Sequence, residues 1–348
     1  MIGIVFEHST VLWGDFFKRT GDRLIQASAI QSFKFATIAF FLIGGFLINH
    51  KFTEYTPFQY IKNRFKNTIG PWLFWVTLLI LLDIGHIAFM SYKFGHQPEP
   101  FFPFLFEDLR RIVFYTSYWF IFNFLLCIAI LLFFKKYIYS LWFGAFWGAV
   151  SLFYSVNLYY GWIPTEHTTA LFGFVFYLWL GVYFSKYYDK VSIFISKISW
   201  TWMILINVVL FLLADLEILH LMQIGSADSF NTLRLSNILY SLTMFLLLLK
   251  MGPLKGLQKY LKPRETTFGI YLIHQIWIFR LLPELFRPFN LKVEEMTVYG
   301  AVGYTILRFI VVYGLTFLLV KLLLKTRFKW IIGIGKSSNR LKNVSLKN

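Results

Sequence analysis

Residues 69–90 read IGPWLFWVTLLILLDIGHIAFM, and this stretch decides the fold class. A helix needs roughly 20 apolar residues to cross the hydrocarbon core of a bilayer, and Asp83 is the only formally charged residue among these. The whole chain of 348 residues is similar in character, because 57% of it is apolar, 21% aromatic and 15% charged, with a mean hydropathy of +0.60. Soluble domains are about 45–50% apolar and about 25% charged. The composition therefore excludes a soluble or disordered protein, and a single cysteine, Cys127, excludes a disulfide scaffold.

Further apolar segments lie on both sides of this stretch. Together they predict an all-α integral membrane protein, a polytopic bundle of about ten transmembrane helices. The ten predicted spans are Met1–Phe17, Phe33–Ile48, Ile69–Met90, Ile112–Phe134, Tyr137–Tyr154, Thr169–Ser185, Ile198–Leu219, Leu235–Leu249, Thr267–Leu282 and Val298–Leu324.

The positive residues indicate an orientation. If the N-terminus is cytoplasmic, inner loops and the C-terminal tail hold about two thirds of the loop Lys and Arg residues, as the positive-inside rule requires. We therefore expect both termini in the cytoplasm of a cell that carries the protein in its inner, or plasma, membrane. The net charge of +17 is then a signal of topology and of contact with anionic lipid, and no soluble segment is long enough for a nucleic-acid surface. We expect one transmembrane domain over residues 1–330, a basic cytoplasmic tail over 331–348, and no cleaved signal peptide.

His8 is the first candidate for catalysis. It lies in the first predicted span, in Ile4-Val5-Phe6-Glu7-His8-Ser9, where an ionisable side chain costs roughly 2.5–3.5 kcal/mol and needs a reason. A neutral imidazole can take a proton from a hydroxyl near pH 7, which is the step that acyl transfer to an alcohol requires. The alternative is a histidine that only hydrogen-bonds neighbouring helices. Glu7 cannot orient His8, because neighbours on a helix point apart, whereas Asp83 or another helix could.

The second candidate is the basic stretch before the third span, Tyr60-Ile61-Lys62-Asn63-Arg64-Phe65-Lys66-Asn67. Lys62, Arg64 and Lys66 place three cations within five residues, and such a cluster suits a phosphate-rich ligand such as coenzyme A. Plain positive-inside anchoring is the alternative. The paired glycines Gly44 and Gly45 permit either close helix packing or ligand access.

Two aromatic groups complete the candidate site. Tyr271 and His274 in Gly269-Ile-Tyr-Leu-Ile-His274 are three residues apart and share a helix face, so they could line one polar cavity. Trp119, in Tyr118-Trp119-Phe120, could contact a sugar ring or an acyl chain, although most such groups only pack. The sequence has no zinc-ligand spacing, nucleotide-binding glycine loop or Gly-x-Ser-x-Gly elbow, so we expect no metal cofactor. These residues by themselves leave an enzyme and a transporter both open.

The order of these motifs resembles that of the membrane acyltransferase family 3. The resemblance rests on the histidine of the first span, the small-Gly-Phe-Leu-Ile element, the basic stretch, Trp119-Phe120 and the final Gly-Ile-Tyr-Leu-Ile-His motif. A Leu-x-Leu-Gly-x-Tyr element at Leu178–Tyr183 also matches, and the likeness covers essentially the whole chain. Two positions depart from the family pattern. Its arginine eleven residues before the histidine would precede Met1, and Asn67 stands where it has a second arginine.

The resemblance implies an O-acyltransferase that moves an acyl group, most often acetyl from cytoplasmic acetyl-CoA, to a hydroxyl. The acceptor would be a sugar of a cell-surface polysaccharide or a lipid-linked sugar. His8 would be the essential histidine, which deprotonates the acceptor or briefly carries the acetyl group, and Arg64 the first arginine of the basic stretch. The alternative is a transporter or flippase for a lipid-linked sugar. Such a carrier predicts internal repeats and discontinuous helices, and no internal repeat is evident.

Overall fold

The computed structural model describes residues 1–13, 16–49, 56–95, 100–166 and 170–335, and these residues form helices without any strand. The α-helices are α1 (Ile2–Ser9), α2 (Thr20–Lys34), α3 (Ala36–Asn49), α5 (Pro57–Phe94), α6 (Phe101–Tyr115), α7 (Trp119–Phe133), α8 (Leu141–Tyr160), α9 (Val175–Lys186), α10 (Tyr188–Lys197), α11 (Trp200–Gln223), α12 (Leu235–Met251), α13 (Lys255–Leu261), α14 (Pro263–Ile276), α15 (Leu282–Phe286) and α16 (Val298–Leu324). The short 3₁₀ and π segments are η1 (Lys135–Tyr137), η2 (Leu171–Phe174), η3 (Trp277–Leu281, a π-helix), η4 (Arg287–Phe289), η5 (Val293–Glu295) and η6 (Arg327–Ile332).

The lengths of these helices support a polytopic membrane protein. Within the described ranges, five helices are long and apolar enough to cross a membrane, and up to seven if each of two bent pairs counts as one span. Helices α2 and α3 together make one of the five, over Thr20–Asn49, so the span predicted at Phe33–Ile48 begins earlier than expected. The full number of ten spans and the cytoplasmic location of both termini remain predictions.

The first predicted span, Met1–Phe17, differs most from the structure. Helix α1 ends at Ser9, and its eight residues extend only about 12 Å, which is far short of a bilayer. Thr10 is in an extended conformation, and its hydroxyl accepts a hydrogen bond from the amide of Leu12 at 3.2 Å. The same hydroxyl lies 3.4 Å from that of Thr305 on α16. The chain therefore leaves the helix inside the bundle, where neighbouring groups satisfy its backbone.

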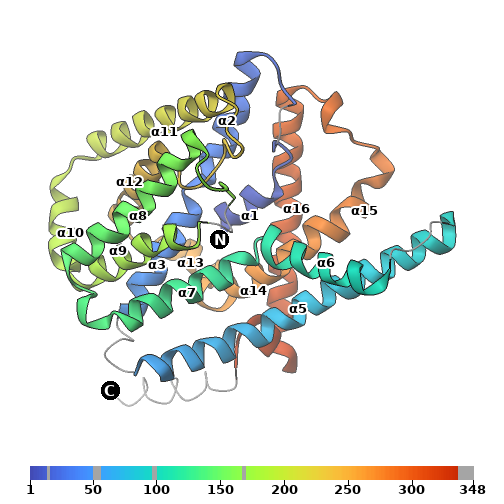
Figure 1. The fold of residues 1–348 in the computed structure, drawn as a ribbon, viewed down its shortest axis with the longest axis horizontal. Coiled ribbons are helices and arrows are strands. Elements are labelled where there is room, and N and C mark those ends of the chain that lie inside the picture. Colours follow the sequence, from blue (N-terminus) through green and yellow to red (C-terminus); the bar gives the residue numbers. More distant parts are fainter. Residues whose placement is uncertain (14–15, 50–55, 96–99, 167–169, 336–348) are drawn as a thin grey trace.

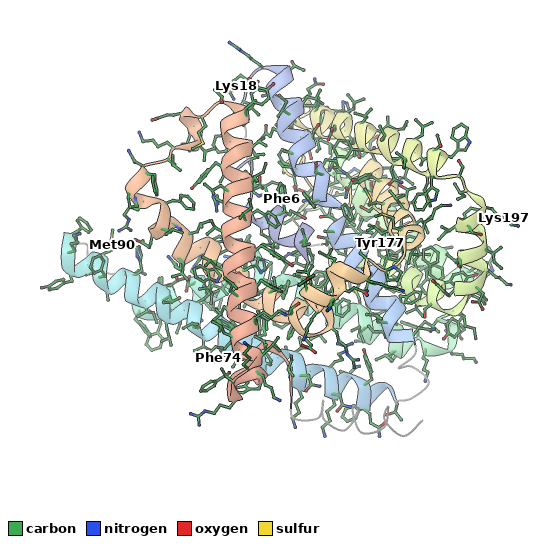
Figure 2. All side chains as sticks on the ribbon, turned by 180° about the vertical axis from the view of Figure 1, so that it is seen from behind. Phe6, Lys18, Phe74, Met90, Tyr177 and Lys197 are labelled. Carbon is green, nitrogen blue, oxygen red and sulfur yellow. The ribbon has the colours of Figure 1, made fainter. Side chains whose placement is uncertain are left out.

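The long helices surround α1. In Figure 1, α16 stands upright beside α1, α5 runs obliquely across the lower part of the molecule, and α2 and α3 continue from one end toward the other. Figure 2 shows Phe6 of α1 near the middle of the molecule, between Lys18 at one end and Phe74 at the other. The Phe6 ring contacts those of Phe33 on α2 and Phe309 on α16, at centroid distances of 4.4 and 5.4 Å. The short helix thus lies well inside the bundle.

The fourth predicted span, Ile112–Phe134, is not one straight helix. Helices α6 and α7 meet at a break over Thr116–Tyr118 and are bent by 60° relative to each other. The hydroxyl of Thr116 accepts from the amide of Tyr118 at 3.3 Å and donates to the carbonyl of Ile112 at 2.6 Å, so its side chain caps both sides of the break. Hydroxyl side chains that bond the local backbone in this way compete with helix continuation.

The packed part of the chain extends beyond residue 330. Ile331 and Ile332 are buried, and the Trp75 indole donates to the carbonyl of Ile331 at 2.8 Å. A Cβ atom on Gly269 would lie 3.0 Å from that of Ile332, so η6 packs directly on α14. The expected basic tail begins at 331, and residues 336–348 of it lie outside the described residues.

Candidate active site

Two histidines from opposite ends of the sequence meet inside the bundle. Nδ1 of His8 on α1 lies 2.9 Å from Nε2 of His274 on α14, and their rings are parallel within 10° at a centroid distance of 5.2 Å. His274 is completely buried. His8 is half-buried. A buried imidazole among apolar helices needs partners for its polar atoms, and His8 is one such partner of His274.

The contacts of His274 determine which nitrogen of each ring carries its proton. Nδ1 of His274 lies 3.1 Å from the carbonyl oxygen of Ile270, one turn earlier on α14. A carbonyl oxygen can only accept, so Nδ1 of His274 is the N–H, and Nε2 of the neutral ring is the acceptor. His8 therefore donates from Nδ1 to His274. In a neutral His8 ring this leaves the lone pair on Nε2, which is the atom that can act as a base.

A polar group at the α6–α7 break lies against this histidine pair. Nε2 of Gln275 donates to the Ser117 hydroxyl at 2.6 Å and lies 3.4 Å from Nδ1 of His8 and 3.3 Å from Nε2 of His274. The hydroxyl of Tyr271 donates to the carbonyl of Ser117, and that of Tyr118 donates to the carbonyl of Leu272 at 2.5 Å. Each segment thus satisfies the other's backbone, and α14 is fixed against the break.

Sequence reasoning missed three members of this group: Ser117, Tyr118 and Gln275. Each lies next to or within two residues of a residue that was selected, Trp119 or His274. The consecutive Thr116 and Ser117 inside an otherwise apolar segment were the available signal for a break.

Of the three expected pocket residues, Tyr271 and His274 lie at the histidine pair, with their rings 5.9 Å apart. The ring of Trp119 contacts those of Phe120 and Phe174, at centroid distances of 6.0 and 5.6 Å. Phe120 in turn lies 6.0 Å from the Tyr271 ring. Trp119 is therefore part of an aromatic cluster that adjoins the site through Phe120.

Glu7 and Lys34 hold α1 in its place. Their side chains form a salt bridge of 2.7 Å in which Lys34 is 1% and Glu7 9% exposed, and the ammonium group lies 4.9 Å from the centre of the Trp13 ring. The Lys34 ammonium group is therefore held inside the bundle. Glu7 points away from His8, as expected for adjacent residues on a helix.

The expected role of Asp83 as a partner of His8 is filled by His274. Asp83 instead forms a salt bridge of 2.6 Å with Arg111 and a second one with Arg280. Across the described part of the chain, no group of three or more His, Cys, Asp or Glu side chains could hold a metal ion.

The basic stretch is helical and forms the first turns of α5. Lys62, Arg64 and Lys66 are all exposed. Lys62 and Lys66 are four residues apart and share one face of the helix. Arg64 lies on another face, where it donates to the Tyr60 hydroxyl at 2.8 Å and stacks over that ring at 5.5 Å. The three cations therefore surround the end of α5 and do not form one row.

Comparison with known proteins identifies the family of this chain. A family model described as an acyltransferase domain, that of acyltransferase family 3, matches residues 1–336. The chain belongs to acyltransferase family 3. None of the curated proteins and none of the solved structures compared with it matches. The family supports membrane acyltransferase activity with an acyl donor as co-substrate. The matched residues include both α1 and α14, the helices that carry the histidine pair.

Proposed function

We propose that this membrane acyltransferase is an O-acetyltransferase of the bacterial inner membrane. It would transfer acetyl from acetyl-CoA to a hydroxyl of a cell-surface polysaccharide or a lipid-linked sugar. The observation that carries the proposal is the bond between His8 and His274, because it orients the half-buried His8 imidazole with Nε2 as its basic atom.

In the reaction, the acceptor hydroxyl approaches Nε2 of His8. As the hydroxyl oxygen bonds to the thioester carbonyl carbon, its proton passes to Nε2. The imidazolium that forms is stabilised by the bond from Nδ1–H to His274. The C–S bond then breaks, the proton moves from Nε2 to the departing sulfur, and coenzyme A leaves as a thiol beside the new acetyl ester.

The acyl donor would bind where α5, α14 and η6 come together. Lys62, Arg64 and Lys66 provide cations for its phosphate groups, and Arg64 is already held in place by Tyr60. Helix α14 starts at this end, and His274, which is eleven residues after Pro263, lies about 16 Å farther along the helix. The thioester would thus approach the histidine pair along α14.

A carrier for a lipid-linked sugar is the other function that the sequence left open. The α6–α7 break is a feature that a carrier would also have. Membership of an acyltransferase family across residues 1–336 favours group transfer over transport.

The test of the proposal is the variant His8→Ala. We expect acetyl transfer from acetyl-CoA to surface glycan to fall by about 10²–10⁴-fold, the contribution of a positioned base, with unchanged expression. The measurement is acetate content of the glycan by mass spectrometry, in cells that carry the native protein or the variant.

His220→Ala is the matched control, because His220 is an exposed histidine on α11. It should retain full acetylation. Normal acetylation by His8→Ala would overturn the proposal, as would an equal loss in both variants.

A further inference from the structure

A depression lies on α6, on the far side of the α6–α7 break from α7. Its volume is about 430 Å³, which is within the range of about 300–1,000 Å³ found for small-molecule sites. It combines two aromatic rings with two acids and two guanidinium groups. The residues that line it are Phe104, Glu107, Asp108, Arg110, Arg111 and Tyr115.

The floor of this depression is fixed by salt bridges. Arg111 bonds Asp108 at 2.5 Å and Asp83 of α5 at 2.6 Å, and Asp83 also pairs with Arg280 of η3. Asp108 is 5% exposed, and its Oδ2 is buried without a hydrogen-bond partner among the described residues. This oxygen is enclosed by protein, so Asp108 is a fixed part of the floor that holds Arg111 in place.

The rim is more exposed and adaptable. Arg110 bonds Glu107 at 3.3 Å and lies over the Tyr115 ring at 5.8 Å, with both partners more than half exposed. Two acids and two arginines balance in charge, so the depression does not favour a highly charged ligand. A ligand with several hydroxyl groups would instead find both donors and acceptors, together with ring faces for its C–H groups.

The chain connects this depression directly to the histidine pair. Tyr115 is two residues before Ser117, which accepts the hydrogen bond from Gln275 beside both imidazoles. Arg280 is six residues after His274. The depression is also remote from the basic end of α5, since the 19 residues from Arg64 to Asp83 extend about 29 Å along one helix.

We propose that the depression on α6 is the binding site for the acceptor sugar. Tyr115 and Phe104 would contact the apolar face of a sugar ring. Glu107 and Arg110 would bond its hydroxyls. This assignment rests on the proposed function. It places the acceptor, which carries the hydroxyl, at a site separate from that of the acyl donor.

The experiment measures sugar binding without any transfer. Oligosaccharides released by mild acid from the surface glycan of the producing cells are labelled with a fluorophore and titrated with the full-length protein in detergent, in the absence of acetyl-CoA. We expect saturable binding by the native protein. We expect at least about tenfold weaker binding by Tyr115→Ala and Glu107→Gln, since losing a ring contact and a charged hydrogen bond each typically costs about that factor or more. Tyr115→Phe keeps the ring and should bind close to the native level.

Phe106→Ala is the matched control, because Phe106 is an exposed aromatic residue of α6 that does not line the depression. It should bind as the native protein does. The unlabelled oligosaccharide, free or on a polyprenyl diphosphate, is used as competitor. Stronger competition by the polyprenyl-linked oligosaccharide than by the free one would show that the acceptor is a lipid-linked sugar. No saturable binding, or equal binding by the native protein, Tyr115→Ala and Glu107→Gln, would overturn the proposal.

Transfer assays distinguish this proposal from the proposed function. With acetylation intact in the native protein, Tyr115→Ala should raise the KM for the acceptor and leave the KM for acetyl-CoA unchanged. If Tyr115→Ala leaves the acceptor KM unchanged while His8→Ala is inactive, the sugar site is wrong and the proposed acetyltransferase function still holds. The native protein could instead bind the sugar saturably, with Tyr115→Ala and Glu107→Gln losing this binding, and yet acetylate nothing. That result would contradict the proposed acetyltransferase function and support the sugar site.

Discussion

At the scale of single residues, the direction of each side chain on α1 determines its role. Successive residues on a helix are about 100° apart, so Glu7 and His8 reach different helices although they are neighbours in sequence. Glu7 pairs with Lys34 of α2, and His8 bonds His274 of α14. Glu7 attaches the short helix, and His8 is the residue that we propose for catalysis.

The pair of histidines leads to a prediction for His274. His274→Ala removes the acceptor for Nδ1–H of His8, so the ring can rotate or change tautomer, and we expect kcat to fall by about 10²-fold or more. His274→Gln offers a side-chain oxygen near the position of Nε2, and should retain more activity than His274→Ala. The measurements are kcat for acetyl transfer and ¹⁵N chemical shifts of the His8 ring. Equal activity of the native protein and His274→Ala would show that His274 only packs.

At the scale of elements, α1 is too short to be stable without its neighbours. Isolated helices under about 12–15 residues are marginal even in favourable sequences, and α1 has eight. Its position depends on Glu7–Lys34, on Thr10 with Thr305, and on the contacts of Phe6 with α2 and α16. The catalytic candidate is therefore positioned by tertiary contacts more than by its own helix.

The buried salt bridge gives the second prediction. Lys34→Met leaves Glu7 charged and without its cation in the interior, and removal of one partner of a buried pair typically costs about 3–5 kcal/mol. The double variant Glu7→Leu with Lys34→Met should recover much of that loss. Thermal unfolding in detergent measures both. Glu284→Gln, in the exposed pair with Arg287, is the control and should change stability by less than about 1 kcal/mol.

The close packing of α3 and α9 gives the third prediction. A Cβ atom on Gly45 would lie 2.0 Å from the carbonyl oxygen of Leu178, and one on Gly181 would lie 2.1 Å from that of Leu42. Because both obstacles are backbone atoms, Gly45→Ala or Gly181→Ala must separate the helices, at a cost of about 1–3 kcal/mol or more. The thermal midpoint in detergent should fall. Gly303→Ala on α16, which meets nothing within 4 Å, should not lower it.

At the scale of the whole molecule, the cations gather where α5, α14 and η6 contact one another. The carbonyl oxygen of Asn67, just after the basic stretch, lies 3.7 Å from where a Cβ of Gly333 would be. Lys262 and Arg264 at the start of α14 and Arg327 of η6 are exposed, as are Lys62, Arg64 and Lys66. Three separate segments thus bring positive charge to the region where these helices meet.

This arrangement predicts a specific kinetic effect. Lys62→Gln with Lys66→Gln should raise the KM for acetyl-CoA by about tenfold, because charge-assisted bonds to phosphate are lost, each about 1.5–3 kcal/mol when fully made. The KM for S-acetyl-N-acetylcysteamine, a thioester without phosphates, should not change. Lys190→Gln with Lys197→Gln, on α10, is the matched control and should affect neither substrate. An equal rise for both thioesters would contradict a phosphate-binding role.

How much the sequence could predict depends on how far apart the interacting residues are. Apolar segment length fixed the helical membrane class, because backbone groups in lipid must bond within their own segment. Motif order also indicated the family, and the match over residues 1–336 confirms it. Local rules likewise predicted that Glu7 and His8 point apart, that Tyr271 and His274 share a face, and that Gly44 and Gly45 allow close helix packing as one of two options.

Only the tertiary structure decided that α1 stops at Ser9, that α6 and α7 break at Ser117, and that His8 bonds His274. These outcomes depend on contacts between residues far apart in the sequence, 266 positions for the two imidazoles and 295 for Thr10 and Thr305, which no local pattern encodes. Hydropathy cannot separate a span from a half-helix either, because some of the polar groups that follow α1, such as the Val11 amide, are satisfied by Thr305 of α16. The sequence by itself thus determined that the chain is a helical membrane protein of this family, and the packing of its helices determined which polar side chains meet inside it.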